Sequence, residues 1–195
     1  DGVVLDDATR AVLARVPDDT WAIHARMGIA AADRVAPSLQ EALQYPSLNV
    51  RGLSSGWVGD DARTIIPPTA TAEIDVRLVP ESDPARLLAL MRQHIEGLGF
   101  HIVSGRDPTT EERRTHPRLI RFDDEVSYAA FRTDFDTPAG QWLVSAFERL
   151  FGERPIMERT AGGSIPISPF VTTLRVPAVS VGTVNPDNNQ HSPNE

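Results

Sequence analysis

The stretch that decides the fold is residues 69–79, TATAEIDVRLV, in which apolar and polar side chains alternate. The apolar positions along it are Ala72, Ile74, Val76 and Leu78. The polar positions between them are Thr71, Glu73, Asp75 and Arg77. Because successive side chains of a strand point to opposite faces, this alternation predicts a β-strand with one buried face and one polar face.

The segments beside this strand predict a sheet combined with helices. Residues 47–53, SLNVRGL, also alternate and are expected to form a strand. The dipeptide 83–84, Asp-Pro, provides an N-cap and a first-turn proline for a helix that ends near Gly97. Residues 100–103 then return as a strand. The order strand, strand, helix, strand favours an α+β domain in which helices cover an antiparallel sheet.

The remaining segments suggest helices before this unit and a change of pattern after it. Residues 5–43 are helical in pattern, with acidic start signals before each helix. The charged residues 106–118 predict a solvated loop, and the alternating residues 126–135 predict a strand. We place a domain boundary near residues 131–136. The first domain is then 1–132, in which 1–45 is a helical elaboration.

The second predicted domain, residues 133–195, begins with a helix that opens at Thr137-Pro138. Its inner face is predicted to consist of Trp142, Leu143, Ala146, Phe147, Leu150 and Phe151. Short apolar strands are expected at residues 156–157 and 176–181, on either side of a short helix. Such short apolar strands between helices suggest the edge of an α/β sheet.

The composition limits the classes of function. The chain has 195 residues, 41% hydrophobic and 24% charged, with a formal net charge of −8. This acidic balance argues against binding to nucleic acid or to an anionic membrane. There is no cysteine, so any metal site must use His, Asp and Glu. No apolar run reaches the roughly 18 residues that a membrane span needs.

His191 is the candidate metal ligand. It stands in the closing run 190–195, QHSPNE, directly after a predicted apolar strand, which suits a ligand on a short loop. The other histidines have no partners at metal-ligand spacing. A catalytic metal takes at least three protein ligands, so most of such a site must lie elsewhere. The chain also begins without Met, and we expect it to be an interior piece of a larger protein.

Three further positions are candidates for contact with a substrate. The loop Gly162-Gly163-Ser164 lets backbone approach a ligand, and Ser164 can cap a helix that favours an oxyanion; the alternative is a plain turn. Arg77 can clamp a carboxylate through two hydrogen bonds; the alternative is a solvated pair with Glu73 or Asp75. Thr64 can bond a substrate or serve a turn.

Four stretches of sequence, in this order, resemble one family of enzymes. They are residues 45–53 (YPSLNVRGL), 63–67 (RTIIP), 76–80 (VRLVP), and 162–166 (GGSIP) followed by 191–195 (HSPNE). The family comprises the co-catalytic zinc peptidases and deacylases of metallopeptidase family twenty. It includes carboxypeptidase G, cytosolic dipeptidases such as carnosinase, aminoacylase and succinyl-diaminopimelate desuccinylase. The likeness spans about residues 45–195.

The resemblance implies a two-domain enzyme with two zinc ions per active site, manganese or cobalt being alternatives. A lid domain would form the homodimer, joined to a C-terminal piece of an α/β catalytic domain. His191 would bind one metal, and Arg77 the substrate carboxylate. Thr64 would act across the dimer in the partner's site. The loop Gly162-Gly163-Ser164 would contact substrate in its own subunit.

The sequence also departs from the family pattern. The family's upstream His-x-Asp pair, bridging Asp, catalytic Glu-Glu pair, further acidic ligand and lid histidine have no counterpart in this chain, and none of its residues is assigned as catalytic. Glu111-Glu112 stands in a charged run with neighbouring arginines and is interpreted as solvated. We therefore expect a fragment that is inactive alone, from a parent that cleaves a small peptide or an N-acyl amino acid. The alternative is a non-catalytic dimerisation domain. The exact substrate and the compartment stay open.

Overall fold

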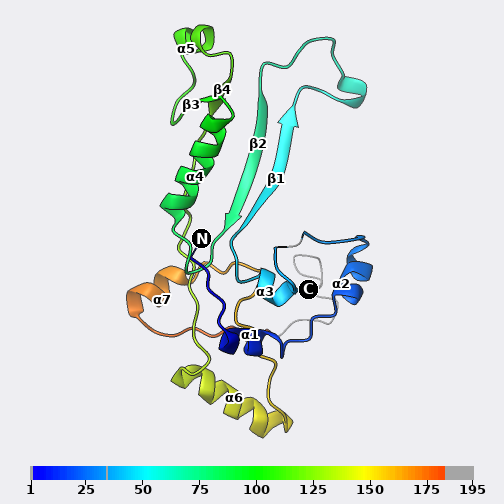
Figure 1. Cartoon of the computed structure of the whole chain (residues 1–195), viewed down its shortest axis with the longest axis vertical. Helices are drawn as coiled ribbons and strands as arrows, with labels where there is room; N and C mark the ends of the chain where they lie inside the picture. The colour runs from blue at the N-terminus through cyan, green and yellow to red at the C-terminus, as the bar shows by residue number, and fades with distance from the viewer. Residues whose placement is uncertain (1, 34, 183–195) are drawn as a thin grey trace.

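The computed structural model describes residues 2–33 and 35–182. The elements are, in chain order, α1 (Asp7–Leu13), α2 (Thr20–Met27), α3 (Leu39–Ala42), β1 (Ser47–Ser55), η1 (Gly59–Asp61), β2 (Ala70–Arg77), α4 (Pro84–Gly97), β3 (His101–Val103), α5 (Thr110–Thr115), β4 (Leu119–Arg121), α6 (Pro138–Phe151) and α7 (Ser168–Leu174). Figure 1 shows an elongated arm that holds β1 to β4 with α4 and α5. The helices α1, α2, α3, α6 and α7 gather at the other end of the molecule.

Strands β1 and β2 form an antiparallel hairpin, as the two alternating stretches predict. Ser47 pairs with Arg77 at its base, and Ser55 pairs with Ala70 toward its tip. The register shifts once in the middle of β1, which is a β-bulge that bends the strand locally. Both predicted strands and the α+β class are therefore confirmed.

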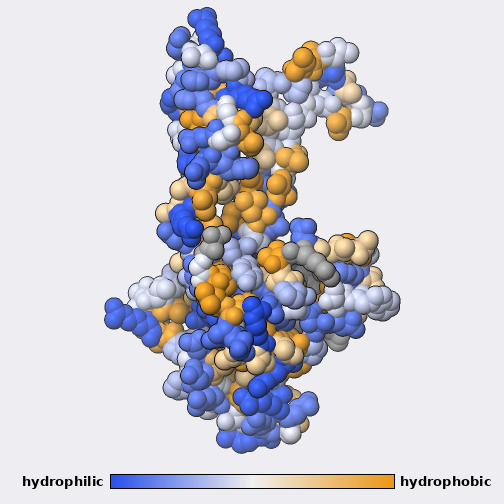
Figure 2. Space-filling view, in the orientation of Figure 1, coloured by the Kyte–Doolittle hydropathy of each residue, from blue (hydrophilic) through white to orange (hydrophobic). Residues whose placement is uncertain are grey.

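The apolar face of this hairpin is not buried within the described chain, contrary to the prediction. Four apolar residues of the hairpin are 42–80% exposed, namely Leu48, Val50, Leu53 and Ile74. Figure 2 shows apolar residues at the surface along the hairpin and at its tip. The alternation predicts which side chains share a face, but burial also requires a second layer, which the described helices do not place there.

Strand β3 forms a separate sheet instead of extending the hairpin. It pairs in parallel with β4, starting at His101 opposite Leu119, so the prediction of one sheet is wrong. The charged stretch 106–118 contains the helix α5, so its prediction as a loop is also wrong. A capping box starts α5: the Thr109 hydroxyl accepts from the Glu112 backbone N–H, and the Glu112 carboxylate accepts from the Thr109 N–H.

The helical pattern predicted over residues 5–43 is confirmed for three short helices, α1, α2 and α3, while residues 28–33 and 35–38 are not helical. Acidic caps explain where α1 and α2 begin. The carboxylates of Asp6 and Asp19 each accept a backbone N–H from the first turn, at 2.8 and 2.9 Å. A second carboxylate, that of Asp18, accepts the backbone N–H of Leu39 at 2.7 Å. This bond joins the start of α3 to the segment before α2.

Helix α6 begins and ends where the sequence predicts. Thr137 caps its first turn, and Gly152 ends it in the left-handed conformation with φ of 77°. The predicted inner face is exposed at three positions, Trp142, Leu150 and Phe151, with exposed fractions of 62–75%. The helical period is therefore correct, whereas the expected burial of this face is wrong for the described chain.

Three predicted strands are absent. Residues 126–135, 156–157 and 176–181 belong to no strand, so the described part of the C-terminal segment has helices and no sheet. A strand exists only when a neighbouring strand completes its hydrogen-bond ladder, and side-chain alternation does not supply that neighbour. The predicted domain boundary near residues 131–136 stays a prediction.

The chain exposes far more surface than a compact protein of its mass. Its accessible area is 15105 Å², whereas a compact monomer of 21.3 kDa exposes about 9,100 Å². The buried apolar residues among those described are Leu13, Val16, Val79 and Val103. Within the same residues, no helix is long and apolar enough to cross a membrane. The chain therefore has a small core of its own and wide uncovered surfaces.

Candidate functional site

Two of the residues singled out from the sequence meet in the structure. Arg77, the last residue of β2, donates a hydrogen bond of 2.9 Å from Nη1 to Oγ of Ser164, which lies 87 positions later. Its Nε donates a second bond of 2.9 Å to Oδ2 of Asp75. The solvated pair with Asp75 is therefore present, and it leaves one edge of the guanidinium turned to the glycine loop.

The Arg77–Ser164 pair retains hydrogen-bond donors for a ligand. The Arg77 side chain is 46% exposed, and its Nη2 has no hydrogen bond to the described residues. Ser164 accepts through its oxygen, so its own O–H remains available to donate. A guanidinium N–H beside a hydroxyl is a donor set suited to the two oxygens of a carboxylate.

The two glycines of the loop have different surroundings. A side chain at Gly162 would begin 3.3 Å from Cδ2 of Leu43, whereas one at Gly163 would meet nothing within 4 Å. The absence of a side chain at Gly162 therefore lets the loop pack closely against the segment that follows α3. Gly163 keeps an open surface beside Ser164, as a ligand would need.

Ser164 does not cap a helix, so that part of the prediction is wrong. The helix α7 begins at Ser168, its N-cap position is Ile167, and no side chain caps it. The reason is local: Pro166 disfavours helical backbone at the residue before it, so a helix cannot start directly after Ser164. The Ser164 hydroxyl is instead engaged by Arg77.

Thr64 lies at the opposite end of the hairpin from Arg77. Seven residue steps separate Arg77 from Ala70 along β2, which is about 24 Å of strand, and Thr64 lies beyond Ala70 in the exposed tip. The tip also holds Arg63, whose guanidinium carbon lies 4.7 Å from the centre of the Trp57 ring. The structure therefore does not bring Thr64 to the Arg77–Ser164 pair of its own chain.

The described residues do not form a metal site. No group of three or more His, Asp or Glu side chains that could hold an ion occurs in residues 2–33 and 35–182. His191 lies outside the described residues. The rings of His101 and His116 stack with centres 3.8 Å apart and planes 3° apart, so they face each other rather than converge on an ion.

Sequence reasoning missed an ion cluster that follows the end of β2. Both Nη atoms of Arg132 bond to the carboxylate of Glu81, and Nη2 of Arg159 lies 4.0 Å from it. The bonds from Arg132 lower the pKa of Glu81. Burial lowers the pKa of Arg159, and the nearby charge of Arg132 lowers that pKa further. Partners so distant in sequence leave no local pattern to detect.

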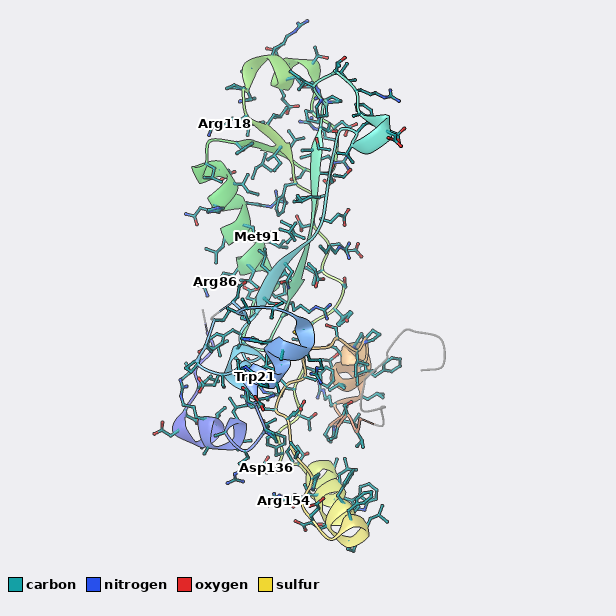
Figure 3. All side chains as sticks on the ribbon, turned by 90° about the vertical axis from the view of Figure 1, so that its right-hand side faces the viewer. Trp21, Arg86, Met91, Arg118, Asp136 and Arg154 are labelled. Carbon is teal, nitrogen blue, oxygen red and sulfur yellow. The ribbon has the colours of Figure 1, made fainter. Side chains whose placement is uncertain are left out.

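An open pocket elsewhere shares no residue with the Arg77–Ser164 pair. Its volume is about 190 Å³, and its lining residues are Val12, Arg15, Arg154, Pro155, Ile156 and Met157. Figure 3 places Arg154 beside α6, at the end of the molecule opposite to the part of the arm that carries Arg118. The pocket is therefore no extension of the candidate site.

Comparison with known proteins identifies relatives of this chain. Residues 10–101 match the family described as the peptidase dimerisation domain. The chain is 27% identical over 160 residues to Beta-Ala-His dipeptidase of Mus musculus, covering 78% of this chain and 28% of that protein. It is 24% identical over 159 residues to Cys-Gly metallodipeptidase dug1 of Schizosaccharomyces pombe, covering 81% of this chain and 31% of that protein. The chain therefore spans less than a third of these curated relatives.

Solved structures with the same fold are also peptidases. The M20 family metallo-carboxypeptidase Sso-CP2 from Sulfolobus solfataricus superposes with a TM-score of 0.66 at 24% identity, covering 90% of this chain and 36% of that one. The di-peptidase Dug1p from Saccharomyces cerevisiae superposes with a TM-score of 0.62 at 21% identity, covering 89% and 34%. At these identities the likeness concerns the fold, which agrees with the α+β expectation.

Proposed function

We propose that the chain is part of a metal-dependent peptidase or amidohydrolase of the M20 family, because residues 10–101 match the peptidase dimerisation domain and a solved M20 peptidase has the same fold. The reaction is hydrolysis of an amide bond close to a free carboxylate. The observation that carries the proposal is the 2.9 Å hydrogen bond between Arg77 and Ser164, because it assembles carboxylate-binding donors at an exposed position. Dipeptides, peptides cleaved at their C-terminus and N-acyl amino acids all have an amide bond close to a free carboxylate.

The geometry supports a specific mode of substrate binding. One carboxylate oxygen accepts from Nη2 of Arg77, and the other accepts from the hydroxyl of Ser164. The positive charge of Arg77 supplies affinity, and the two-point contact orients the substrate. Gly163 leaves room for the substrate beside the loop. Fixing the carboxylate in this way holds the neighbouring amide bond at a defined place for attack by water.

We further propose that the arm forms a homodimer in which Thr64 serves the partner's site. The length of β2 separates Thr64 from Arg77, so Thr64 needs a second copy to reach a bound substrate. The uncovered apolar side chains of the hairpin provide surface whose burial would favour association.

The metal of the proposed enzyme is zinc, two ions per active site, with manganese or cobalt as alternatives. Relatives of the chain are named metallodipeptidases, which supports a metal but not its identity. When bound, the metal supplies Lewis-acid activation of the hydrolytic water. The described residues hold no ligand cluster, so we derive no step through the metal and propose only His191 as one ligand from this chain.

Replacing His191 with alanine in the whole protein is expected to remove one metal equivalent per subunit, because a site that loses one of its protein ligands binds its ion far less tightly. Elemental analysis of the purified variant measures the loss. The control is His94→Ala, which changes an exposed histidine on α4 and should leave the metal content unchanged. A full metal complement in His191→Ala would exclude His191 as a ligand.

The proposed function is tested with the protein purified from its full coding sequence. It should hydrolyse a dipeptide with a free C-terminal carboxylate, should favour that dipeptide over its C-terminal amide, and should lose activity to a chelator. The 195-residue chain alone should hydrolyse neither. A whole protein that dimerises but cleaves neither compound with any of the three metals would instead support a non-catalytic dimerisation domain.

A further inference from the structure

A buried glutamine anchors the residues that immediately precede the glycine loop. Gln44, two residues after α3, has no exposed surface. Its Oε1 accepts two hydrogen bonds, one of 2.6 Å from Nη1 of Arg159 and one of 3.1 Å from Oγ1 of Thr160. Its Nε2 donates to the backbone oxygen of Gln40 at 3.0 Å. The amide is therefore bonded on both sides, and its position is set by α3.

The two donors to Gln44 stand immediately before the loop that carries Ser164. Ser164 lies only four positions after Thr160, so an anchor at Thr160 limits where the hydroxyl of Ser164 can lie. Gly162 allows the loop to approach the same segment closely, because a Cβ atom at this position would lie only 3.3 Å from Cδ2 of Leu43. The loop is thus held against the segment 43–44 at two points.

The ion cluster connects this anchor to the strand that carries Arg77. Glu81 lies four residues after Arg77 and receives both Nη atoms of Arg132. Arg159 lies between the two parts: it donates to Gln44 and has its Nη2 4.0 Å from Glu81. The side chains of Arg132 and Arg159 are only 15% and 19% exposed, so water does little to weaken these interactions.

We propose that Gln44 and Arg159 are positioning residues that hold Ser164 against Arg77 and thereby set the preference for substrates with a free carboxylate. Neither residue touches the substrate. This inference rests on the proposed function, because the preference it explains is that of the proposed amide hydrolysis. It adds residues that the sequence motifs do not mark, and it assigns them an effect on specificity rather than on the chemical step.

The test compares variants of the whole protein on a dipeptide and on its C-terminal amide. In Gln44→Met, which keeps the length of the side chain but removes both acceptor and donor, kcat/KM for the free acid relative to the amide should fall roughly tenfold, the effect of one charge-assisted hydrogen bond. The fall should be in KM, with kcat nearly unchanged. Thr160→Val, a milder isosteric change, should lower the ratio less, and Arg159→Lys should retain part of it.

Two further comparisons separate positioning from a general loss of structure. Gln141→Met removes an exposed glutamine on α6 that also donates to a backbone oxygen, and it should leave the ratio unchanged. In a Ser164→Ala background, Gln44→Met should have little further effect on the ratio if it acts through Ser164. A Gln44→Met enzyme that loses activity equally on both compounds would overturn the positioning role and leave the proposed function intact.

Failure of the proposed function would be visible in the wild-type protein, which would cleave neither compound. In that case the positioning role of Gln44 is tested by hydrogen–deuterium exchange of the peptide that covers residues 161–165. Faster exchange there in Gln44→Met, and not in Gln141→Met, would support the anchor. Equal exchange in the two variants would overturn it.

Discussion

Arg77→Ala in the whole enzyme is expected to lower kcat/KM for a peptide with a free C-terminal carboxylate by about 100-fold, the loss that follows when a charge-assisted contact is removed. The guanidinium is the positive charge of the Arg77–Ser164 pair, and alanine leaves only the hydroxyl to meet the carboxylate. Steady-state kinetics on the acid and on its C-terminal amide measure the effect. The amide should change little, because it carries no negative charge for Arg77 to pair with.

The matched control is Arg51→Ala. Arg51 lies in the same hairpin and pairs with Glu73 at 2.8 Å, and both side chains are well exposed. Its kinetics should equal those of the wild type, and both variants should retain full metal content. Unchanged kinetics of Arg77→Ala on the free acid would show that the carboxylate binds elsewhere.

Glu81→Ala is expected to lower the free energy of unfolding by about 3 kcal/mol, because it leaves two partly buried arginines without their shared carboxylate. Arg132 and Arg159 lie close enough for their charges to repel, and Glu81 is the carboxylate that both approach. Urea denaturation of the purified protein measures the loss. The control Glu73→Gln, at an exposed ion pair, should cost less than about 1 kcal/mol.

The same cluster predicts a dependence of stability on pH. Hydrogen bonds from Arg132 hold the pKa of Glu81 below its ordinary value of 4.5 in the folded protein. The stabilisation is therefore complete above pH 4.5, and it is lost as the pH falls through the lower pKa of the folded state. Glu81→Gln should show a smaller decrease of unfolding free energy between neutral pH and pH 3 than the wild type. Equal decreases would mean that Glu81 is not held by Arg132.

Local signals in the sequence were sufficient for most of the helices and for the hairpin. Helices α4 and α6 begin at their predicted Pro84 and Pro138, behind caps that bond to backbone within three residues. The strands β1 and β2 pair as predicted because a hairpin brings its own neighbour. Three of the four motif stretches, 45–53, 63–67 and 76–80, lie within residues 10–101, which match the peptidase dimerisation domain as the resemblance predicts.

Predictions that required a distant partner were less successful. Residues 126–135 alternate as β2 does, but within residues 2–33 and 35–182 no second strand pairs with them. The apolar faces of the hairpin and of α6 follow the predicted periods and yet remain exposed. Period is a property of one segment, whereas burial depends on a second segment that covers it.

For the candidate site, the sequence by itself singled out Arg77 as a possible carboxylate clamp and the glycine loop with Ser164 as a possible substrate contact. Only the tertiary structure decided that they touch, that Thr64 is far from both, and that Gln44 stands behind the loop. The physical reason is the range of the interactions. Caps and alternation depend on atoms a few residues apart, whereas the candidate site brings together residues that are 87 or 115 positions apart in the sequence.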